Sequence, residues 1–315
     1  MIEQFRQDIE AGLSAAQKSL PSHYFYDVRG DELFQQIMAM PEYYITEAED
    51  EIFRNKTQEI IDALDVAESN YFEIIELGSG DGKKSKRLLR KLLDKGHDFT
   101  YQPVDISKNI LDHLEKSLVT EMPDLDINTT QALYVDALAG MKDTPHKIIV
   151  MFLGSSIGNL SDDEATDFIY QLGANIKPGD LLLLGVDLKK SRNIVLPAYN
   201  DAAGITARFN LNLLERINRE LGANFVPDNF SHRPEYNENE GIAYSFLVST
   251  AEQSVYIKSL KKSFRFSEGE KIHTEISRKY DEATLKRIIA GTDFTLDRRI
   301  TDSNGYFADY ILKRQ

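Results

Sequence analysis

Continuous apolar runs alternate with segments of helical spacing through the middle of the chain. The runs that predict buried strands are residues 72–76, 101–105, 131–136, 147–153 and 181–187. The stretches between them that predict helices are residues 83–94, 107–119 and 162–176. Strands that are apolar throughout and alternate with helices indicate a parallel sheet covered on both faces. The sequence therefore predicts an α/β fold with a doubly wound sheet.

The alternation stops after Asp187 and resumes near residue 282. Residues 190–280 are too long for one crossover, so they indicate an inserted subdomain. The last two strand-like stretches, residues 293–300 and 306–313, are separated by a short polar turn and predict a terminal antiparallel hairpin. The expected domains are a core of residues 60–189 and 281–315, and a smaller α+β cap, over the carboxyl edge of the sheet, of residues 1–59 and 190–280.

A group of tyrosines precedes the predicted core, at positions 24, 26, 43 and 44. One interpretation is an aromatic cluster that packs an N-terminal cap. The other is a substrate wall, because a tyrosine hydroxyl can bind a polar ligand while its ring excludes water. The local sequence leaves both interpretations open.

The stretch F-E-I-I-E-L-G-S-G-D-G-K, residues 72–83, combines a strand, a glycine turn and the start of a helix. This is the layout of a nucleotide-binding loop, since glycine lets the backbone turn sharply and lets a ligand approach without meeting a Cβ. A P-loop counted from Gly78 would place Lys83 where glycine is required. The dinucleotide pattern G-x-G-x-x-G also puts Lys83 in its third glycine position.

The pattern that remains is E/D-x-G-x-G-x-G, starting at Glu76, which resembles the first motif of S-adenosylmethionine (SAM) methyltransferases. A different ligand or a plain structural turn are the alternatives. Asp105 ends the next predicted strand, where a carboxylate can accept hydrogen bonds from both ribose hydroxyls of an adenosine. Its other possible role is an N-cap, which Ser107 could fill equally well. Asp136 ends the third predicted strand, where the sheet should meet the adenine.

A glycine- and serine-rich turn, residues 154–160, follows the predicted central strand. Ligands of doubly wound sheets bind outside the carboxyl ends of the strands, so we expect Asn159 beside the glycine loop. Its amide could orient a substrate, or it could be a turn residue next to Gly158.

Composition narrows the possible partners. The chain has 315 residues, 42% of them hydrophobic, and a formal net charge of −14, which argues against binding to nucleic acid or to anionic lipid. It has no cysteine, which excludes disulfides, thiol chemistry and thiolate metal sites, and we expect no metal. No apolar run reaches membrane length and the N-terminus lacks the apolar stretch of a signal peptide. We expect a cytoplasmic monomer that binds a small molecule.

Short motifs extend this pattern along nearly the whole chain. They are K-S-L-P at 18–21, F-Y-D at 25–27, M-P-E-Y-Y at 40–44, E-L-G-S-G at 76–80, L-G-S-S-I-G-N-L at 153–160, A-Y-N-D-A-A-G-I-T at 198–206 and H-T-E-I-S at 273–277. In these motifs the chain resembles the histidine-specific SAM-dependent methyltransferases, which make Nα-trimethylhistidine (hercynine), the first intermediate of ergothioneine synthesis.

The resemblance implies a site for each ligand. The residues implied around SAM, or its product S-adenosylhomocysteine (SAH), are Gly78, Gly80, Lys84, Asp105 and Asp136. Those implied around the amino and carboxylate groups of the substrate are Tyr26, Tyr43, Gly154, Asn159 and Tyr199. Among these, Tyr26 and Asn159 are implied to hold the amine during methyl transfer. Glu275 and Ser277 are implied to bind the imidazole.

The chain departs from the family pattern at a few positions. Tyr244 stands where the family has a methionine on the substrate side, and Ala137 stands where a phenylalanine follows the adenine-site aspartate. Residues 81–83 also differ. The change at Tyr244 leaves a modified histidine or another small amine as the alternative substrate, and a non-catalytic SAM-binding protein as the alternative function.

Overall fold

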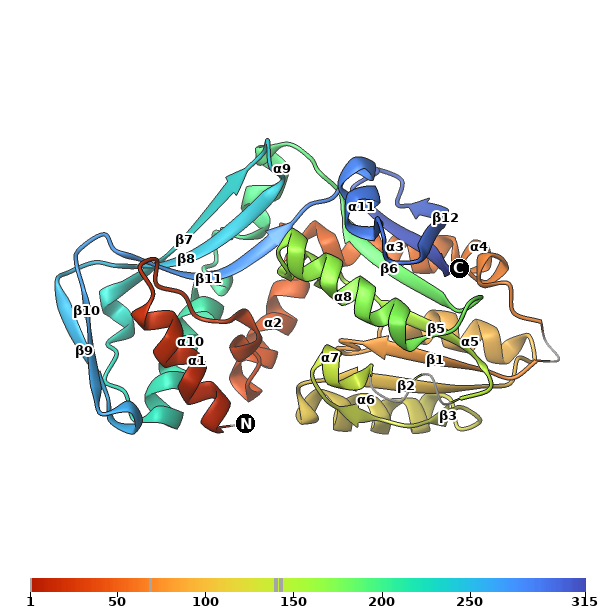
Figure 1. Ribbon diagram of the computed structural model, residues 1–315, viewed down its shortest axis with the longest axis horizontal. Coiled ribbons are helices and arrows are strands. Elements are labelled where there is room, and N and C mark those ends of the chain that lie inside the picture. The colour runs from red at the N-terminus through yellow and green to blue at the C-terminus, as the bar shows by residue number, and fades with distance from the viewer. Residues whose placement is uncertain (1, 68–69, 139–140, 142–143) are drawn as a thin grey trace. The chain divides into compact units, whose positions relative to one another are not determined.

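The chain forms two compact units in the computed structural model, which describes residues 2–67, 70–138, 141 and 144–315 (Figure 1). The first unit consists of Met1–Tyr44 and Lys190–Ser277, and the second consists of Ile45–Lys189 and Arg278–Gln315.

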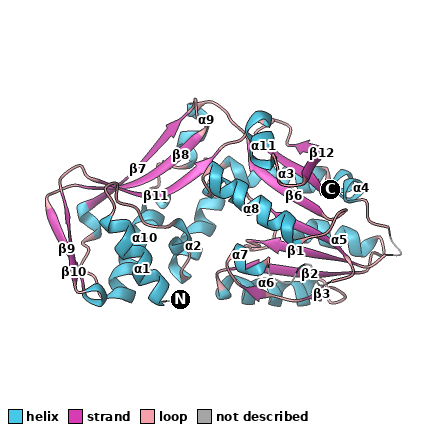
Figure 2. Cartoon of the chain, in the orientation of Figure 1, coloured by secondary structure: helices cyan, strands magenta, loops and turns pink. Residues whose placement is uncertain are grey.

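A large mixed sheet runs through the second unit (Figures 1 and 2). Its strands are β1 (Phe72–Leu77), β2 (Phe99–Asp105), β3 (Asp126–Ile127), β4 (Thr130–Gln131), β5 (Lys147–Phe152), β6 (Leu181–Asp187), β12 (Phe294–Thr301) and β13 (Phe307–Arg314). They lie in the order β12-β13-β6-β5-β1-β2-β3, and β4 also pairs with β2. Strands β1 to β6 pair in parallel, whereas β13 is antiparallel to both β6 and β12. The predicted doubly wound sheet with its terminal antiparallel hairpin is thus confirmed.

Helices accompany this sheet. They are α3 (Tyr44–Asn55), α4 (Thr57–Leu64), α5 (Ser85–Asp94), α6 (Lys108–Glu121), α7 (Tyr134–Ala137), α8 (Asp162–Asn175), α11 (Glu282–Ile289) and the short 3-10 helix η3 (Ser156–Asn159). Helix α8 begins with a capping box, in which the Ser161 and Glu164 side chains each accept a hydrogen bond from the other's backbone N–H. It packs beside α11, and α4 packs beside α5.

The core of the second unit explains why its central strands are apolar throughout. Phe152 on β5 and Leu184 on β6 are fully buried, and they join one cluster with Ile169 and Leu172 of α8. Burial of each such side chain contributes about 1.5–3 kcal/mol to the free energy of folding. Because a parallel sheet is covered on both faces, no position on β5 or β6 can be polar without a buried partner.

The first unit combines helices with small antiparallel sheets. Its helices are α1 (Ile2–Ser14), η1 (Ser22–Phe25), α2 (Val28–Met38), α9 (Arg192–Ala198), α10 (Ile205–Leu221), η4 (Pro227–Asn229) and η5 (Lys258–Leu260). Its strands are β7 (Phe230–Asn237), β8 (Ile242–Ser249), β9 (Gln253–Ile257), β10 (Lys262–Phe266) and β11 (Lys271–Arg278). Strands β11, β8 and β7 form one sheet, and β9 and β10 form a separate hairpin.

Hydrogen bonds join the N-terminal segment to the distant residues 190–277. The Leu20 N–H donates to the His273 carbonyl and the His273 N–H donates to the Lys18 carbonyl, both at 2.8 Å, so the segment extends along β11. Asp27 caps α2 through the Gly30 N–H and also accepts a hydrogen bond from Asn212 on α10 at 2.9 Å. These bonds explain how segments far apart in sequence form one unit.

Residues 45–59, which were expected in the cap, lie in the unit that contains the large sheet. The reason is burial, since Glu49, Ile52 and Phe53 on α3 are all fully buried. Lys56 leaves the helical conformation, with φ −124° and ψ 17°, so α3 and α4 are two separate helices.

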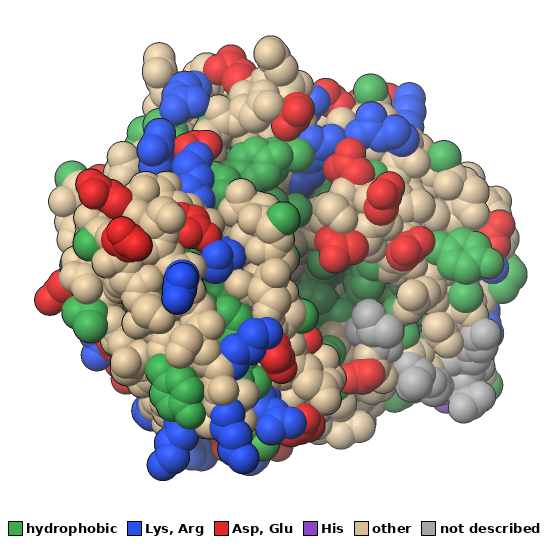
Figure 3. All heavy atoms as spheres, turned by 60° about the vertical axis from the view of Figure 1, so that its left-hand side comes forward, with side chains coloured by type: hydrophobic (Ala, Val, Ile, Leu, Met, Phe, Trp, Pro, Cys, Tyr) green, Lys and Arg blue, Asp and Glu red, His purple; other side chains and the backbone are tan. Residues whose placement is uncertain are grey.

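The surface carries charges of both signs. On the face in Figure 3, acidic and basic side chains are interspersed despite the net charge of −14. None of the helices in the described part of the chain combines the length and the apolar character needed to cross a bilayer.

A buried ion pair lies at the carboxyl end of β6. Lys279 Nζ is 2.7 Å from Asp187 Oδ2, and neither side chain is exposed to solvent. The backbone reinforces this pair, because the Tyr280 N–H donates to the Asp187 carbonyl at 2.7 Å. Removing one member of a buried pair leaves a charge without its counterion in a medium of low polarity.

We predict that Lys279→Met lowers the free energy of unfolding by about 3–5 kcal/mol, because Asp187 stays buried without its cation. Urea unfolding measures this loss. Lys286→Met is the matched control, since Lys286 forms a 2.6 Å pair with Glu282 but is 63% exposed, and it should cost less than about 1 kcal/mol. Equal losses in the two variants would contradict the prediction.

Candidate active site

The glycine loop lies at the carboxyl ends of β1 and β2 in the second unit. The Gly78 and Ser79 N–H groups both donate to the Val104 carbonyl, at 2.8 and 3.2 Å. Gly80 and Gly82 have φ values of +54° and +65°, which favour glycine. A Cβ on Gly82 would collide with Leu114, whereas a Cβ on Gly80 would meet no atom within 4 Å. Gly80 therefore borders open space.

Asp105 stands at the end of β2 and faces this loop. Its Oδ2 accepts the Gly80 N–H at 3.1 Å and its Oδ1 accepts the Ser107 N–H at 2.9 Å. Burial raises the pKa of Asp105, while the two N–H groups act in the opposite direction. The N-cap of α6 is Ser107, whose hydroxyl accepts the Ile110 N–H, so Asp105 is not that cap. Each carboxylate oxygen retains lone pairs for ligand hydroxyls.

Glu76 is a buried acid beneath the glycine loop. Its carboxylate accepts hydrogen bonds from Ser85 Oγ at 2.6 Å and from the Tyr101 hydroxyl. Burial raises the pKa of Glu76 to about 7, although those two hydrogen bonds and the charge of Lys84 lower it. The sequence pattern placed an acid here but gave no sign of its protonation.

Asp136 does not end a strand, and the prediction of a strand at 131–136 is wrong. The chain leaves the sheet after β4, and Asp136 lies exposed on the four-residue helix α7. The reason is Tyr134, whose ring turns inward and packs edge-to-face on Phe152 at 5.0 Å. The Tyr134 hydroxyl would lie 2.7 Å from a Cβ on Gly78, so it is Tyr134 that closely approaches the glycine loop.

The turn after β5 contains two residues in the left-handed region, Gly154 with φ +70° and Ser155 with φ +58°. The Gly154 N–H donates to both carboxylate oxygens of Glu49, at 2.9 and 3.0 Å. Lys84, just before α5, also donates to Glu49, and its Nζ would lie 3.7 Å from a Cβ on Gly154. Asn159 is half-buried at the end of η3. Sequence reasoning identified Gly154 and Lys84 but missed Glu49, because an acid in an amphipathic helix is usually solvated.

In the first unit, Tyr26 and Tyr43 belong to an aromatic cluster. Phe34 contacts both rings edge-to-face, with centroids 5.6 Å from Tyr26 and 6.4 Å from Tyr43. Phe209 on α10 lies 5.9 Å from Tyr26. Both tyrosines are half-buried. The rings of Tyr26 and Tyr43 therefore pack in an aromatic cluster, as one of the two interpretations expected, and a role of their hydroxyls in substrate binding stays a prediction.

Tyr199 and Ser277 come together in the same unit. The Tyr199 hydroxyl donates to Ser277 Oγ at 2.8 Å, and both residues are 7% exposed. Nε2 of His232 lies 3.0 Å from the Tyr199 carbonyl oxygen. Burial lowers the pKa of His232, although that hydrogen bond raises it. This network holds two of the predicted substrate residues in a fixed arrangement.

Glu275 and Tyr244 lie on neighbouring strands, β11 and β8, and both are half-buried. The Tyr244 ring is 6.1 Å from Phe246 and 6.0 Å from His273, between ring centroids. Its hydroxyl donates to Glu240 at 3.4 Å. The contact of either side chain with a substrate stays a prediction.

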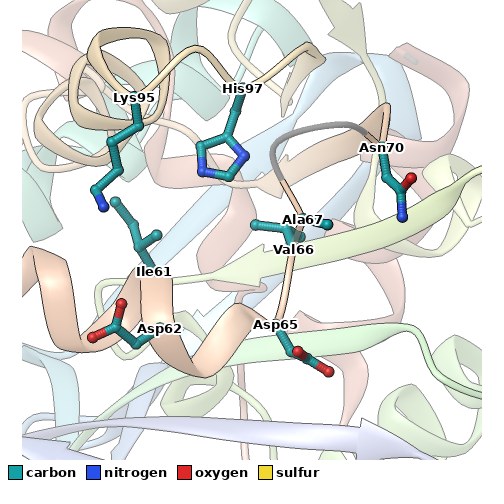
Figure 4. A pocket seen from close by; sticks show the side chains of 8 residues that line it. All are labelled: Ile61, Asp62, Asp65, Val66, Ala67, Asn70, Lys95 and His97. Atoms are coloured by element: carbon teal, nitrogen blue, oxygen red, sulfur yellow. The ribbon is translucent and has the colours of Figure 1, made fainter.

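A surface pocket of about 490 Å³ lies elsewhere in the second unit (Figure 4). Its lining residues are Ile61, Asp62, Asp65, Val66, Ala67, Asn70, Lys95 and His97. Asn70 and His97 come just before β1 and β2, so this pocket is at the amino ends of those strands, opposite the glycine loop. None of the predicted site residues lines it. Within the described ranges, no group of three or more His, Asp or Glu residues could hold a metal ion.

Comparison with known proteins adds a second line of evidence. The family described as "Histidine-specific methyltransferase, SAM-dependent" matches residues 5–314. The histidine N-alpha-methyltransferase of Mycolicibacterium smegmatis is 35% identical over 305 residues, which cover 97% of this chain and 93% of that protein.

Two fungal proteins are more distant. Ergothioneine biosynthesis protein 1 of Schizosaccharomyces pombe is 27% identical, over 98% of this chain but 40% of its own length. The 4-dimethylallyltryptophan N-methyltransferase of Claviceps fusiformis is 24% identical over 96% of this chain and 90% of its own length.

The raised pKa of Glu76 predicts a dependence of stability on pH. A folded-state pKa near 7, above the unfolded value of 4.5, means that the stability contribution is complete below pH 4.5 and is lost as pH rises through 7. The parent loses stability as Glu76 ionises, whereas a Glu76→Gln variant does not. We therefore expect the difference in unfolding free energy between Glu76→Gln and the parent to rise in favour of the variant, by on the order of 2 kcal/mol, from pH 5 to pH 8.

Urea unfolding at a series of pH values measures this difference. Glu252→Gln is the control, because Glu252 is exposed and its variant should follow the parent curve. If the Glu76→Gln curve also runs parallel to the parent, Glu76 does not change its protonation in this range.

Proposed function

The chain belongs to the family of SAM-dependent histidine-specific methyltransferases, and from this premise we propose that it methylates the α-amino nitrogen of L-histidine, up to trimethylhistidine. The observation that carries the proposal is the family match over residues 5–314, because it includes both the glycine loop and the Tyr199–Ser277 pair. The trimethylated product would make the enzyme a source of hercynine for ergothioneine synthesis.

The residues at the carboxyl ends of β1 and β2 fit SAM. Gly80 offers space for a ligand, Gly78 shapes the loop, and Asp105 offers a carboxylate to ribose hydroxyls. Lys84 adds a positive charge beside this loop, and burial alone would lower its pKa, but Glu49 raises it above its usual range. Asp136, exposed on α7, is assigned to the adenine end. When bound, SAM supplies an electrophilic methyl group on its sulfonium.

The chain's own residues then need only hold the amine and exclude water. An ammonium group has no lone pair, so the neutral amine is the form to be captured. We assign Tyr26 and Asn159 to hold it by hydrogen bonds, with Tyr43, Gly154 and Tyr199 around the amino and carboxylate groups. Fixing a nitrogen lone pair in line with the bond that breaks provides much of the rate enhancement. Each of the first two transfers yields an ammonium, which must release a proton to solvent before rotation of the neutral amine permits the next transfer.

Glu275 and Ser277 are assigned to the imidazole ring. Glu275 accepts a hydrogen bond from a ring N–H, and a serine hydroxyl can donate to the other ring nitrogen. The hydrogen bond from Tyr199 orients Ser277. A site that contains such polar groups rejects a phenyl ring, which would leave them without partners.

A second candidate is a methyltransferase of this fold that acts on a modified histidine or another small amine. Tyr244 favours it, since this residue differs from the family pattern, and one relative is named for an indole substrate. A protein that binds SAM without catalysis is the third candidate. We also propose that the enzyme works as a monomer in the cytoplasm.

For the SAM site, we predict that Asp105→Ala weakens SAH binding by roughly 1–3 kcal/mol, because the ribose hydroxyls lose their charged acceptor. Isothermal titration measures the affinity. Asp98→Ala is the control, because Asp98 is exposed near the amino end of the same strand, and it should bind SAH like the parent. Unchanged affinity in Asp105→Ala would remove Asp105 from the site.

For the imidazole site, we predict that Glu275→Ala weakens histidine binding in the presence of SAH at least about tenfold, with little change in SAH affinity. Glu268→Ala, on an exposed turn before β11, should bind histidine normally. A Glu275→Ala variant that methylates histidine as fast as the parent would refute the assignment. A parent that methylates no imidazole amino acid would instead favour the second candidate and direct attention to Tyr244.

A further inference from the structure

Three ionisable side chains meet inside the second unit, beside the turn that follows β5. Glu49 on α3 and Asp309 on β13 are fully buried, and the Lys84 side chain is 22% exposed. Glu49 accepts hydrogen bonds from Lys84 Nζ and from the Gly154 N–H. The ligand sites implied by the sequence include Lys84 and Gly154, but neither of the two acids.

Asp309 presents an unusual problem of hydrogen bonding. Both of its carboxylate oxygens are buried, and neither has a donor among the residues that the structure describes. An ionised carboxylate in such a place carries a large desolvation cost, which a proton removes. Burial, and then the negative charge of Glu49, raise the pKa of Asp309 well above its usual range, although Lys84 lowers it.

A glycine makes room for the two acids to meet. Asp309 pairs in register with Gly185 on β6. A Cβ on Gly185 would collide with Glu49 Oε1 and would lie 3.1 Å from Asp309 Oδ1. Both carboxyl groups therefore lie over the same glycine, which interrupts an otherwise apolar strand. A glycine inside a strand commonly marks such a close approach.

One proton on Asp309 is enough to balance the charges of the groups around it. The groups that face it are Glu49 from α3 and Lys84 from the start of α5, with Glu76 at the end of β1 acting on Lys84. Its neighbours in the sheet, Gly185 on β6 and Ile300 on β12, carry no charge. With Asp309 neutral, the pair of Glu49 and Lys84 is balanced. With Asp309 ionised, two buried carboxylates would share one ammonium.

We propose that Asp309 is held as a neutral carboxylic acid that donates its proton to the Glu49 carboxylate, and that the two acids are positioning residues for the SAM and substrate site. This role rests on the proposed function. The Glu49 carboxylate holds the Gly154 amide at the start of the turn that leads to Asn159. It also holds the Lys84 ammonium beside the glycine loop.

The consequence of losing the proton follows from the same contacts. A second negative charge would repel Glu49 and compete for Lys84. The Gly154 N–H would then lose its fixed acceptor, and the left-handed turn at Gly154 and Ser155 would lose the bond that anchors it. The acid pair thus acts on the site through Gly154 and Lys84 without touching a ligand.

Infrared spectra of the intact protein test the protonation directly. At pH 8.5 the parent should show the carbonyl stretching band of a buried carboxylic acid, with a small shift in heavy water, and Asp309→Asn should lack it. A Glu76→Gln variant identifies any contribution of Glu76 to this band, since the pKa of about 7 leaves Glu76 largely ionised at pH 8.5. If Asp309→Asn removes no acid band, the neutral acid is refuted.

SAH binding by isothermal titration tests the positioning role with a matched pair of variants. Asp309→Asn keeps a donor for Glu49 without a charge, and we expect its affinity within about threefold of the parent. Asp309→Leu has a similar shape but no donor, and we expect a loss of at least about tenfold. Equal losses in the two variants would overturn the role. If Asp309→Leu does not fold, Glu49→Gln replaces it, because that change removes the ion pair with Lys84, and we expect the same loss.

The two measurements separate this inference from the proposed function. A parent that binds SAH but has no acid band at Asp309 refutes the neutral acid alone. A parent that has the band but does not bind SAH refutes the proposed function, and the positioning role with it.

Discussion

The hydrogen bond from the Gly80 amide to the Asp105 carboxylate joins the ends of two neighbouring parallel strands, and the organisation of the second unit depends on it. Strands β1 and β2 run in register from Phe72–Phe99 to Leu77–Val104, so their carboxyl ends stop at the same level. The backbone amides beyond Leu77 then need acceptors, and the Val104 carbonyl and Asp105 provide them. The result is a turn whose remaining open side is at Gly80, where we propose that SAM binds.

Buried ionisable groups with a hydrogen-bond or ion-pair partner are the second constraint. Glu76 accepts hydrogen bonds from two hydroxyl groups, and Asp187 forms an ion pair with Lys279. Glu49 forms an ion pair with a lysine and accepts a hydrogen bond from a backbone amide. These groups surround the carboxyl ends of the central strands. Apolar residues would fill the same space at lower cost in desolvation. We interpret their presence as a means of fixing the loops that follow β1, β5 and β6.

Sequence alone predicted the central sheet well, because strands covered on both faces must be apolar throughout. It failed at residues 131–136, where the apolar run contains a tyrosine that packs inward and coils the chain into α7. It could not identify Glu49, because an acid on a helix is ordinarily exposed. Asp309 and Gly185 did carry a signal, since a polar residue and a glycine each interrupt an apolar strand. The pairing of Tyr199 with Ser277 is invisible in sequence, since 77 residues separate them.

The most direct test of the central claim is a competition assay with the purified parent protein. The enzyme receives SAM and an equimolar mixture of the common amino acids, and mass spectrometry identifies which of them gains methyl groups. The account predicts methylation of histidine at its α-amino nitrogen, progressing to the trimethylated product, with the other amino acids unchanged. Methylation of another amine with histidine left unmodified would contradict it.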